Sequence, residues 1–178
     1  MADYGFMTNF PTLDPELAAA VAMLPNVDFD DLPAARSTFT TLVDVMLADL
    51  SMAGVSLREI TVPGTNGAPD VTVRFFEPEH SDGPLPVLVW IHGGGFAIGT
   101  AASSDPYCVD AVRELGFAVA NVEYRLAPET PFPGPLDDCY AALTYIHSHA
   151  DELGVDPKRI AVGGQSAGGG LAAGTVLR

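Results

Sequence analysis

A chain of 178 residues is long enough for one domain that buries about 70% of the surface of its unfolded form. Only 17% of the residues are charged and 48% are apolar, a balance that suits a sheet buried on both faces. The net charge of −15, with no cluster of Lys or Arg to offset it, excludes nucleic acid and anionic membranes as expected partners.

The N-terminal residues predict a cytoplasmic protein, and the two cysteines predict no metal site. We also expect no cofactor. The first residues lack the basic segment and long apolar core of a secretory signal, and no apolar run approaches the roughly eighteen residues of a membrane span. The two cysteines, Cys108 and Cys139, have no metal-ligand spacing. We therefore expect them to be buried, reduced thiols.

The first 54 residues predict a helical segment. Asp14 can cap a helix with Pro15 in its first turn, and apolar residues follow at helical spacing. A second helix is expected from about Pro33, with apolar positions as far as Leu50 and an end at Gly54.

From residue 55 onward the pattern predicts strands that alternate with helices. Two β-rich runs, 57–62 and 71–76, flank a turn-rich connection and predict a hairpin. Three apolar strands then alternate with three helices, at 87–91, about 104–115, 117–122, about 136–153, 160–163 and from 167 onward. The expected fold class is α/β, with a mostly parallel central sheet and helices on both faces.

The most specific motif is the pentapeptide Gly-Gln-Ser-Ala-Gly at 164–168, which directly follows the last apolar strand. In a strand–turn–helix setting, G-x-S-x-G predicts a nucleophile elbow, a sharp turn that lifts the hydroxyl of Ser166 clear of the sheet. Positions 164 and 168 require small residues such as Gly164 and Gly168, because larger side chains beside so sharp a turn would clash. The following helix would point its first N–H groups at the reacting centre.

A second motif, His-Gly-Gly-Gly-Phe at 92–96, follows strand 87–91 and so lies at the same edge of the sheet. Consecutive glycines let backbone N–H groups turn toward a developing negative charge without side chains in the way. The N–H of Ala167, just after the serine, would add a donor. A merely flexible connection is the other interpretation, and the presence of the elbow disfavours it.

Three spaced motifs together resemble the signature of the bacterial hormone-sensitive-lipase-like family of α/β-hydrolase esterases: His-Gly-Gly-Gly-Phe at 92–96, Tyr-Arg-Leu-Ala-Pro-Glu at 124–129, and Gly-Gln-Ser-Ala-Gly-Gly at 164–169. The resemblance spans essentially the whole chain. It implies a carboxylesterase of short acyl esters, with residues 1–54 as an N-terminal helical cap and residues 55–178 as the N-terminal part of the hydrolase domain.

The same resemblance implies roles for individual residues. Ser166 would form the acyl-enzyme, and the N–H groups of Gly94, Gly95 and Ala167 would supply the oxyanion hole. His92 would hold the glycine loop through hydrogen bonds, and the neighbouring Gly93, like Gly164 and Gly168, would support the motif geometry.

The chain departs from the family pattern in two ways. Gln165 stands where the family usually has Asp, which should change local contacts without loss of the chemistry. Family members are also longer, and their triad runs in the order Ser, Asp or Glu, His. The acid, the base and the C-terminal strands are therefore expected in a segment beyond Arg178. Without that segment strand 160–163 would be an unpaired apolar edge and the chain inactive.

Some alternatives stay open at this stage. His92 is the histidine nearest the chemistry, and we favour support of the loop over general base; the other three histidines are expected to be exposed. Arg125 and Glu129 either fix loops beneath the oxyanion hole or form an ordinary surface ion pair. A non-catalytic module that binds small molecules is the alternative to an esterase. The expected partner is a small-molecule ester, and a homo-oligomer is left open.

Overall fold

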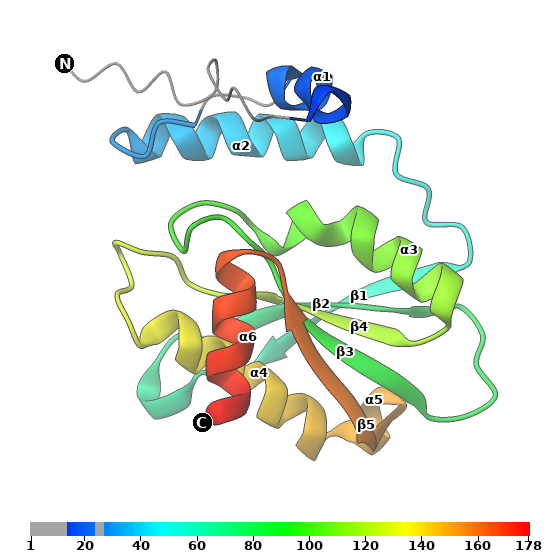
Figure 1. Cartoon of the computed structure of the whole chain (residues 1–178). Helices are drawn as coiled ribbons and strands as arrows, with labels where there is room; N and C mark the ends of the chain where they lie inside the picture. Colours follow the sequence, from blue (N-terminus) through cyan, green and yellow to red (C-terminus); the bar gives the residue numbers. More distant parts are fainter. Residues whose placement is uncertain (1–13, 24–26) are drawn as a thin grey trace.

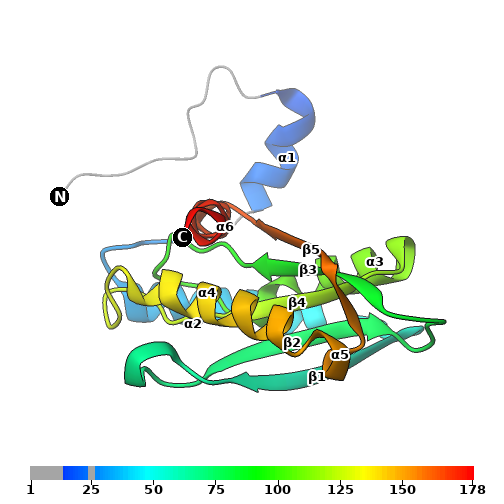
Figure 2. The ribbon, with the colours of Figure 1, turned by 90° about the horizontal axis from the view of Figure 1, so that it is seen from below.

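The central feature of the computed structural model, which describes residues 14–23 and 27–178, is a five-stranded mixed sheet (Figure 1). Its strands are β1 (Val55–Val62), β2 (Val71–Pro78), β3 (Leu85–Ile91), β4 (Ala118–Glu123) and β5 (Val155–Gly164). They lie in the order β1-β2-β4-β3-β5, with β1 and β5 at opposite edges (Figure 2). β2 is antiparallel to β1 and β4, whereas β3 is parallel to β4 and β5. Four strands thus share one direction, and the predicted α/β class is confirmed.

Helices cover both faces of this sheet, as the continuous apolar strands predict. In Figure 1, α3 (Asp105–Leu115) lies above the strands and α4 (Gly134–Ser148) below them. Alternate residues of β3 enter different clusters: Val89 belongs to the cluster that includes α4 and α6 (Ala167–Leu177), and Leu88 packs on the cluster that includes α3. Side chains on successive strand positions point to opposite faces, so an apolar run is buried on both.

The N-terminal helices form as predicted, apart from one boundary. In α1 (Pro15–Met23), Asp14 Oδ1 accepts the N–H of Glu16 at 2.9 Å. α2 (Leu32–Leu47) is capped by Asp31. The predicted end of this helix is Gly54, seven residues beyond the observed one. The apolar residue Leu50, assigned to the helix from its spacing, instead packs against the cluster around α3. That burial competes with another turn of helix.

The helix predicted at 136–153 is in fact two helices, α4 and α5 (Ala150–Leu153), separated at His149. The His149 ring stacks on Tyr145 with centroids 4.0 Å apart, and its Nδ1 lies 3.1 Å from the carbonyl oxygen of Tyr145. The break itself lies in the backbone of His149, whose φ of −111° and ψ of 24° are not helical. His149 is consequently half-buried at the helix end, whereas His147 and His80 are exposed as expected.

β5 is the edge strand next to the elbow. Within the described ranges it pairs with β3 alone, and Ala161 is exposed on it. On α6, Val176 and Leu177 are also exposed. An apolar edge at this position is what the sequence predicts.

The cysteines, the helix lengths and the possible metal ligands can also be examined in the structure. Both cysteines are buried and unpaired with each other. Among residues 14–23 and 27–178, no helix has the length and apolar character needed to cross a membrane. The same residues contain no cluster of His, Cys, Asp or Glu suited to a metal ion.

Candidate functional site

Ser166 lies in a sharp turn between β5 and α6. Its φ of 52° and ψ of −118° belong to a region that residues other than glycine rarely adopt. Its side chain is exposed and makes no capping hydrogen bond to α6, a helix that lies wholly in the described part of the chain. The hydroxyl therefore stands free at the N-terminus of a helix, which is the geometry predicted for an elbow.

The glycines beside Ser166 let this turn approach β3 closely. A Cβ added to Gly168 would overlap the carbonyl oxygens of Ile91 and His92, and one added to Gly164 would overlap the carbonyl oxygen of Gly168. The N–H of Gln165 donates to the oxygen of Ile91 at 3.1 Å. The elbow is thus fastened to the end of β3, from which the glycine loop starts.

The glycine loop, defined here as residues 92–99, is a fixed turn. Gly94 and Gly95 have φ values of +127° and +59°. The carbonyl oxygen of Gly94 accepts the N–H groups of Ala97 at 3.1 Å and Ile98 at 2.9 Å. These bonds argue against a loose connection between β3 and α3. The positions of Gly94 and Gly95 require the left-handed backbone conformation that glycine adopts without strain.

The loop and the elbow are in contact. A Cβ added to Gly93 would lie 3.1 Å from the carbonyl oxygen of Gln165 and 3.5 Å from the Cβ of Ser166. Gly93 therefore faces the serine across a gap in which only a small residue fits. Gly94 and Gly95 follow directly, and Ala167 is the first residue of α6. The assignment of these three as oxyanion donors stays a prediction.

His92 is buried beneath the glycine loop and supports it. Its ring stacks on Tyr124 with centroids 4.2 Å apart, and its Nδ1–H donates to the carbonyl oxygen of Gly93 at 2.7 Å. The Tyr124 hydroxyl donates to the carbonyl oxygen of His92 at 3.0 Å. Burial lowers the pKa of His92 to about 4, so the ring is neutral at pH 7. These contacts favour the supporting role over that of a general base.

The segment that follows the glycine loop is anchored to β4. The N–H of Ala101 donates to Oε2 of Glu123 at 2.7 Å, and the carbonyl oxygen of Ala101 accepts Nδ2 of Asn121 at 2.7 Å. Burial raises the pKa of Glu123. Side chains of β4 thus fix the chain just beyond the glycine loop, while His92 supports the start of the loop.

Arg125 and Glu129 have different partners, so a surface ion pair between them is wrong. Arg125 binds the buried carboxylate of Asp138 on α4 with Nε, Nη2 and its backbone N–H, at 2.7–3.1 Å. Glu129 binds Arg36 on α2. The two residues therefore tie the β4 loop, defined here as residues 124–133, to two separate helices. This arrangement agrees with the other alternative, that they fix loops near the glycine loop.

Sequence reasoning missed two N-terminal residues that lie at the glycine loop, Phe29 and Arg36. A Cβ added to Gly95 would lie 3.2 Å from Cε1 of the Phe29 ring. Arg36 Nε donates to the carbonyl oxygen of Ala97 at 2.9 Å. One signal was available: Arg36 is the single Lys or Arg in residues 1–54. Helical periodicity gave no reason to connect it with a loop sixty residues away.

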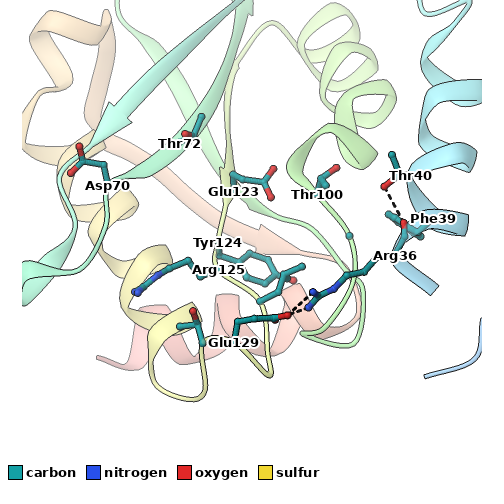
Figure 3. A pocket seen from close by; sticks show the side chains of 13 residues that line it. Arg36, Phe39, Thr40, Asp70, Thr72, Thr100, Glu123, Tyr124, Arg125 and Glu129 are labelled. Carbon is teal, nitrogen blue, oxygen red and sulfur yellow. Dashed lines mark hydrogen bonds and ion pairs between the residues drawn. The ribbon is translucent and has the colours of Figure 1, made fainter. Parts of the chain in front are cut away.

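A cavity of about 560 Å³ lies between α2, the start of β2 and the β4 loop (Figure 3). Arg36, Thr100, Glu123 and Arg125 are among its lining residues. Of the described residues that form its wall, none is Ser166 or an expected oxyanion donor. The cavity is therefore separate from the reacting centre.

Comparisons with known proteins agree with this geometry. A family model described as alpha/beta hydrolase fold matches residues 88–178. Among solved structures, a bacterial heroin esterase is 74% identical with a TM-score of 0.92, covering 96% of this chain and 54% of that one. An esterase from Pyrobaculum calidifontis is 34% identical with a TM-score of 0.80, covering 93% and 52%.

Curated relatives give the same picture. Carboxylic ester hydrolase LipN of Mycobacterium tuberculosis is 36% identical over 91% of this chain and 44% of its own length. Hormone-sensitive lipase of Mus musculus is 42% identical over 52% of this chain and 12% of its own. The chain thus spans about half the length, or less, of the relatives it matches.

Proposed function

Because the chain belongs to the α/β-hydrolase fold family, among relatives of hormone-sensitive lipase, we propose that it is the N-terminal portion of a serine carboxylesterase with Ser166 as nucleophile. The observation that carries the proposal is the contact between an exposed serine at positive φ and a glycine loop fixed beside it. This combination supplies a nucleophile and backbone donors in one place.

In the proposed mechanism, Ser166 Oγ attacks the ester carbonyl carbon and its proton passes to a base. The negative charge that develops on the carbonyl oxygen is stabilised by the N–H groups of Gly94, Gly95 and Ala167. Collapse of this intermediate expels the alcohol, which takes up the proton, and leaves Ser166 acylated. A water molecule then attacks the acyl group, so that the carboxylic acid leaves and the serine hydroxyl is restored.

The base and its carboxylate partner are proposed to come from a segment C-terminal to Arg178. A serine hydroxyl needs an adjacent base at neutral pH. His92 is a poor candidate because its Nδ1–H is bound to the loop backbone and burial lowers its pKa to about 4. The chain covers about half of the length of the esterases it matches, which is consistent with a longer active protein.

Short acyl esters of the acetyl type are the proposed substrates. This choice rests on the 74% identity to a bacterial heroin esterase. The N-terminal segment is proposed to act as a cap, since Arg36 is hydrogen-bonded to the glycine loop and the Phe29 ring lies close to Gly95.

Hydrolysis of p-nitrophenyl acetate and p-nitrophenyl octanoate tests the proposal. The assay uses this chain continued after Arg178 by the C-terminal portion of the bacterial heroin esterase, a chimera called here the completed enzyme. We expect faster turnover of the acetate, a burst of nitrophenol equal to the enzyme concentration, and a loss of at least about 10³-fold in Ser166→Ala. A folded completed enzyme that binds the esters without turnover would instead support the non-catalytic binding module.

A further inference from the structure

We propose that Arg36 on α2 is a positioning residue for the proposed oxyanion hole, because it binds the glycine loop and the β4 loop together. The inference rests on the proposed esterase function. Its structural part, that Arg36 holds the glycine loop in place, can be tested separately from turnover.

Arg36 is bound by its whole guanidinium group. Nε donates to the carbonyl oxygen of Ala97 at 2.9 Å, and Nη2 donates to the carbonyl oxygen of Ala127 at 2.9 Å. Nη1 and Nη2 also donate to the two carboxylate oxygens of Glu129, each at 2.8 Å. Figure 3 shows this pairing of Arg36 with Glu129. One side chain on α2 thus contacts both loops.

The two loops are also joined directly, which closes the arrangement. The N–H of Ala127 donates to the carbonyl oxygen of Phe96 at 2.9 Å. Ala97, whose carbonyl oxygen Arg36 holds, donates its own N–H to Gly94. Arg36 is therefore one hydrogen-bonded residue away from an expected oxyanion donor. A shift of the Ala97 carbonyl would move the turn at Gly94.

The main role of Glu129 is to orient the guanidinium of Arg36. Its side chain is 64% exposed, so the ion pair alone is a weak source of stability. The bidentate geometry, however, fixes the plane of the guanidinium, and its other N–H groups then point at the two carbonyl oxygens. Hydrogen bonds from Arg36 lower the pKa of Glu129 to about 2, so the carboxylate stays charged well into the acidic range.

Lysine cannot reproduce these contacts. A guanidinium offers five N–H donors in a rigid plane, whereas an ammonium is a single point at the end of a flexible stem. The partners surround the guanidinium on several sides, so an ammonium at one point cannot bind all three of them. Arg36→Lys therefore preserves the charge while it weakens the connection between the loops.

The chain contains a matched control, Arg159. It also joins a carboxylate to a backbone carbonyl oxygen, since Nε donates to Asp156 and Nη2 donates to Pro84, each at 2.7 Å. It lies on β5, seven positions before Ser166, and its partners Asp156 and Pro84 lie at the starts of β5 and β3, at the edge of the sheet opposite the glycine loop. Arg159→Lys thus makes the same chemical change far from the glycine loop.

The first measurement is steady-state hydrolysis of p-nitrophenyl acetate by the completed enzyme. For Arg36→Lys we expect kcat to fall about tenfold with KM within about twofold, because oxyanion donors act mainly on the transition state. Arg159→Lys should keep both values. Glu129→Gln, which retains the shape of the side chain, should show a smaller loss of kcat in the same direction.

The second measurement is amide hydrogen exchange of the same variants, which needs no activity. The amides of Ala97, Ile98 and Ala127, each hydrogen-bonded within or between the two loops, should exchange at least about fivefold faster in Arg36→Lys than in Arg159→Lys. Equal exchange in the two variants would overturn the inference, and so would a tenfold loss that appeared in KM alone.

The two measurements distinguish failure of the proposed function from failure of the proposed role of Arg36. If the unsubstituted completed enzyme is folded but inactive, the proposed function fails, and the exchange rates still decide whether Arg36 holds the loop. If Arg36→Lys does not fold, Glu129→Gln provides the same comparison. Unchanged kcat and unchanged exchange in Glu129→Gln would then contradict the role of the pair.

Discussion

Substitution of Gly168 by Ala is the sharpest test of the elbow geometry. An added Cβ would overlap the carbonyl oxygens of Ile91 and His92, and it would lie only 2.7 Å from the carbonyl carbon of Ile91. Real Cβ atoms essentially never approach within 3.0 Å of such neighbours. Because the obstacle is backbone of β3 and not the end of a flexible side chain, α6 and β3 must separate by roughly 1 Å.

That displacement sets the size of the expected effects. Overpacking in a closely packed region costs about 1–3 kcal/mol, so the free energy of unfolding should fall by about 2 kcal/mol. Ser166 and Ala167 move with the start of α6. A misplacement of about 1 Å in an active site can cost about 10²-fold, so kcat/KM for p-nitrophenyl acetate should fall by that factor.

Gly170→Ala is the matched control. This glycine is on the same helix, it is exposed, and an added Cβ would have its nearest neighbour, Cζ of Phe96, at 3.8 Å. Alanine favours helix over glycine by about 1 kcal/mol, so this variant should be slightly more stable than the parent. Urea unfolding and ester hydrolysis of both variants make the comparison. Equal stability and equal activity of the two would refute the claim that the elbow requires glycine for close approach.

Three further outcomes follow from the buried groups. Asp138→Ala leaves the Arg125 guanidinium without its buried carboxylate and should lower the free energy of unfolding by about 3 kcal/mol. Asp156→Ala removes the more exposed carboxylate that Arg159 binds and should have a clearly smaller effect; urea unfolding measures both. The pKa of His92 is lowered to about 4, so the unfolded chain binds this proton more readily, and stability should decline by about 3 kcal/mol as pH falls from 6.5 through 4. The free energy of unfolding of His92→Asn, measured over the same pH range, isolates the contribution of His92. Parallel pH profiles of the two proteins would contradict the prediction. Burial raises the pKa of both cysteine thiols, so iodoacetamide should modify neither until urea unfolds the chain; rapid labelling of the native protein would be the opposite result.

The elbow and the glycine loop could be predicted because local backbone constraints define them. A serine between glycines after an apolar strand has few compatible conformations, and the observed φ of Ser166 belongs to the expected class. The turns at Gly94 and Gly95 follow from the same kind of constraint. Such features depend on residues near one another in the chain, so a sequence reader can recognise them.

The ion pairs could not be predicted because they depend on which elements the fold brings together. Arg36 and Glu129 are 93 positions apart, and nothing in either local pattern selects the other. Glu129 and Arg125 share one motif, which suggested a common role, yet their side chains bind α2 and α4 respectively. The boundary at His149 was missed for a different reason: the backbone leaves the helical region there, with φ of −111° and ψ of 24°, and neither Gly nor Pro marks the position.

The most direct test of the central claim is covalent labelling of the completed enzyme with a serine-directed phosphonate, followed by mass spectrometry of its peptides. We expect one adduct, on the peptide that contains Ser166, and none in Ser166→Ala. A folded completed enzyme that remains unlabelled, or that is labelled at another serine, would contradict the assignment of Ser166 as the nucleophile.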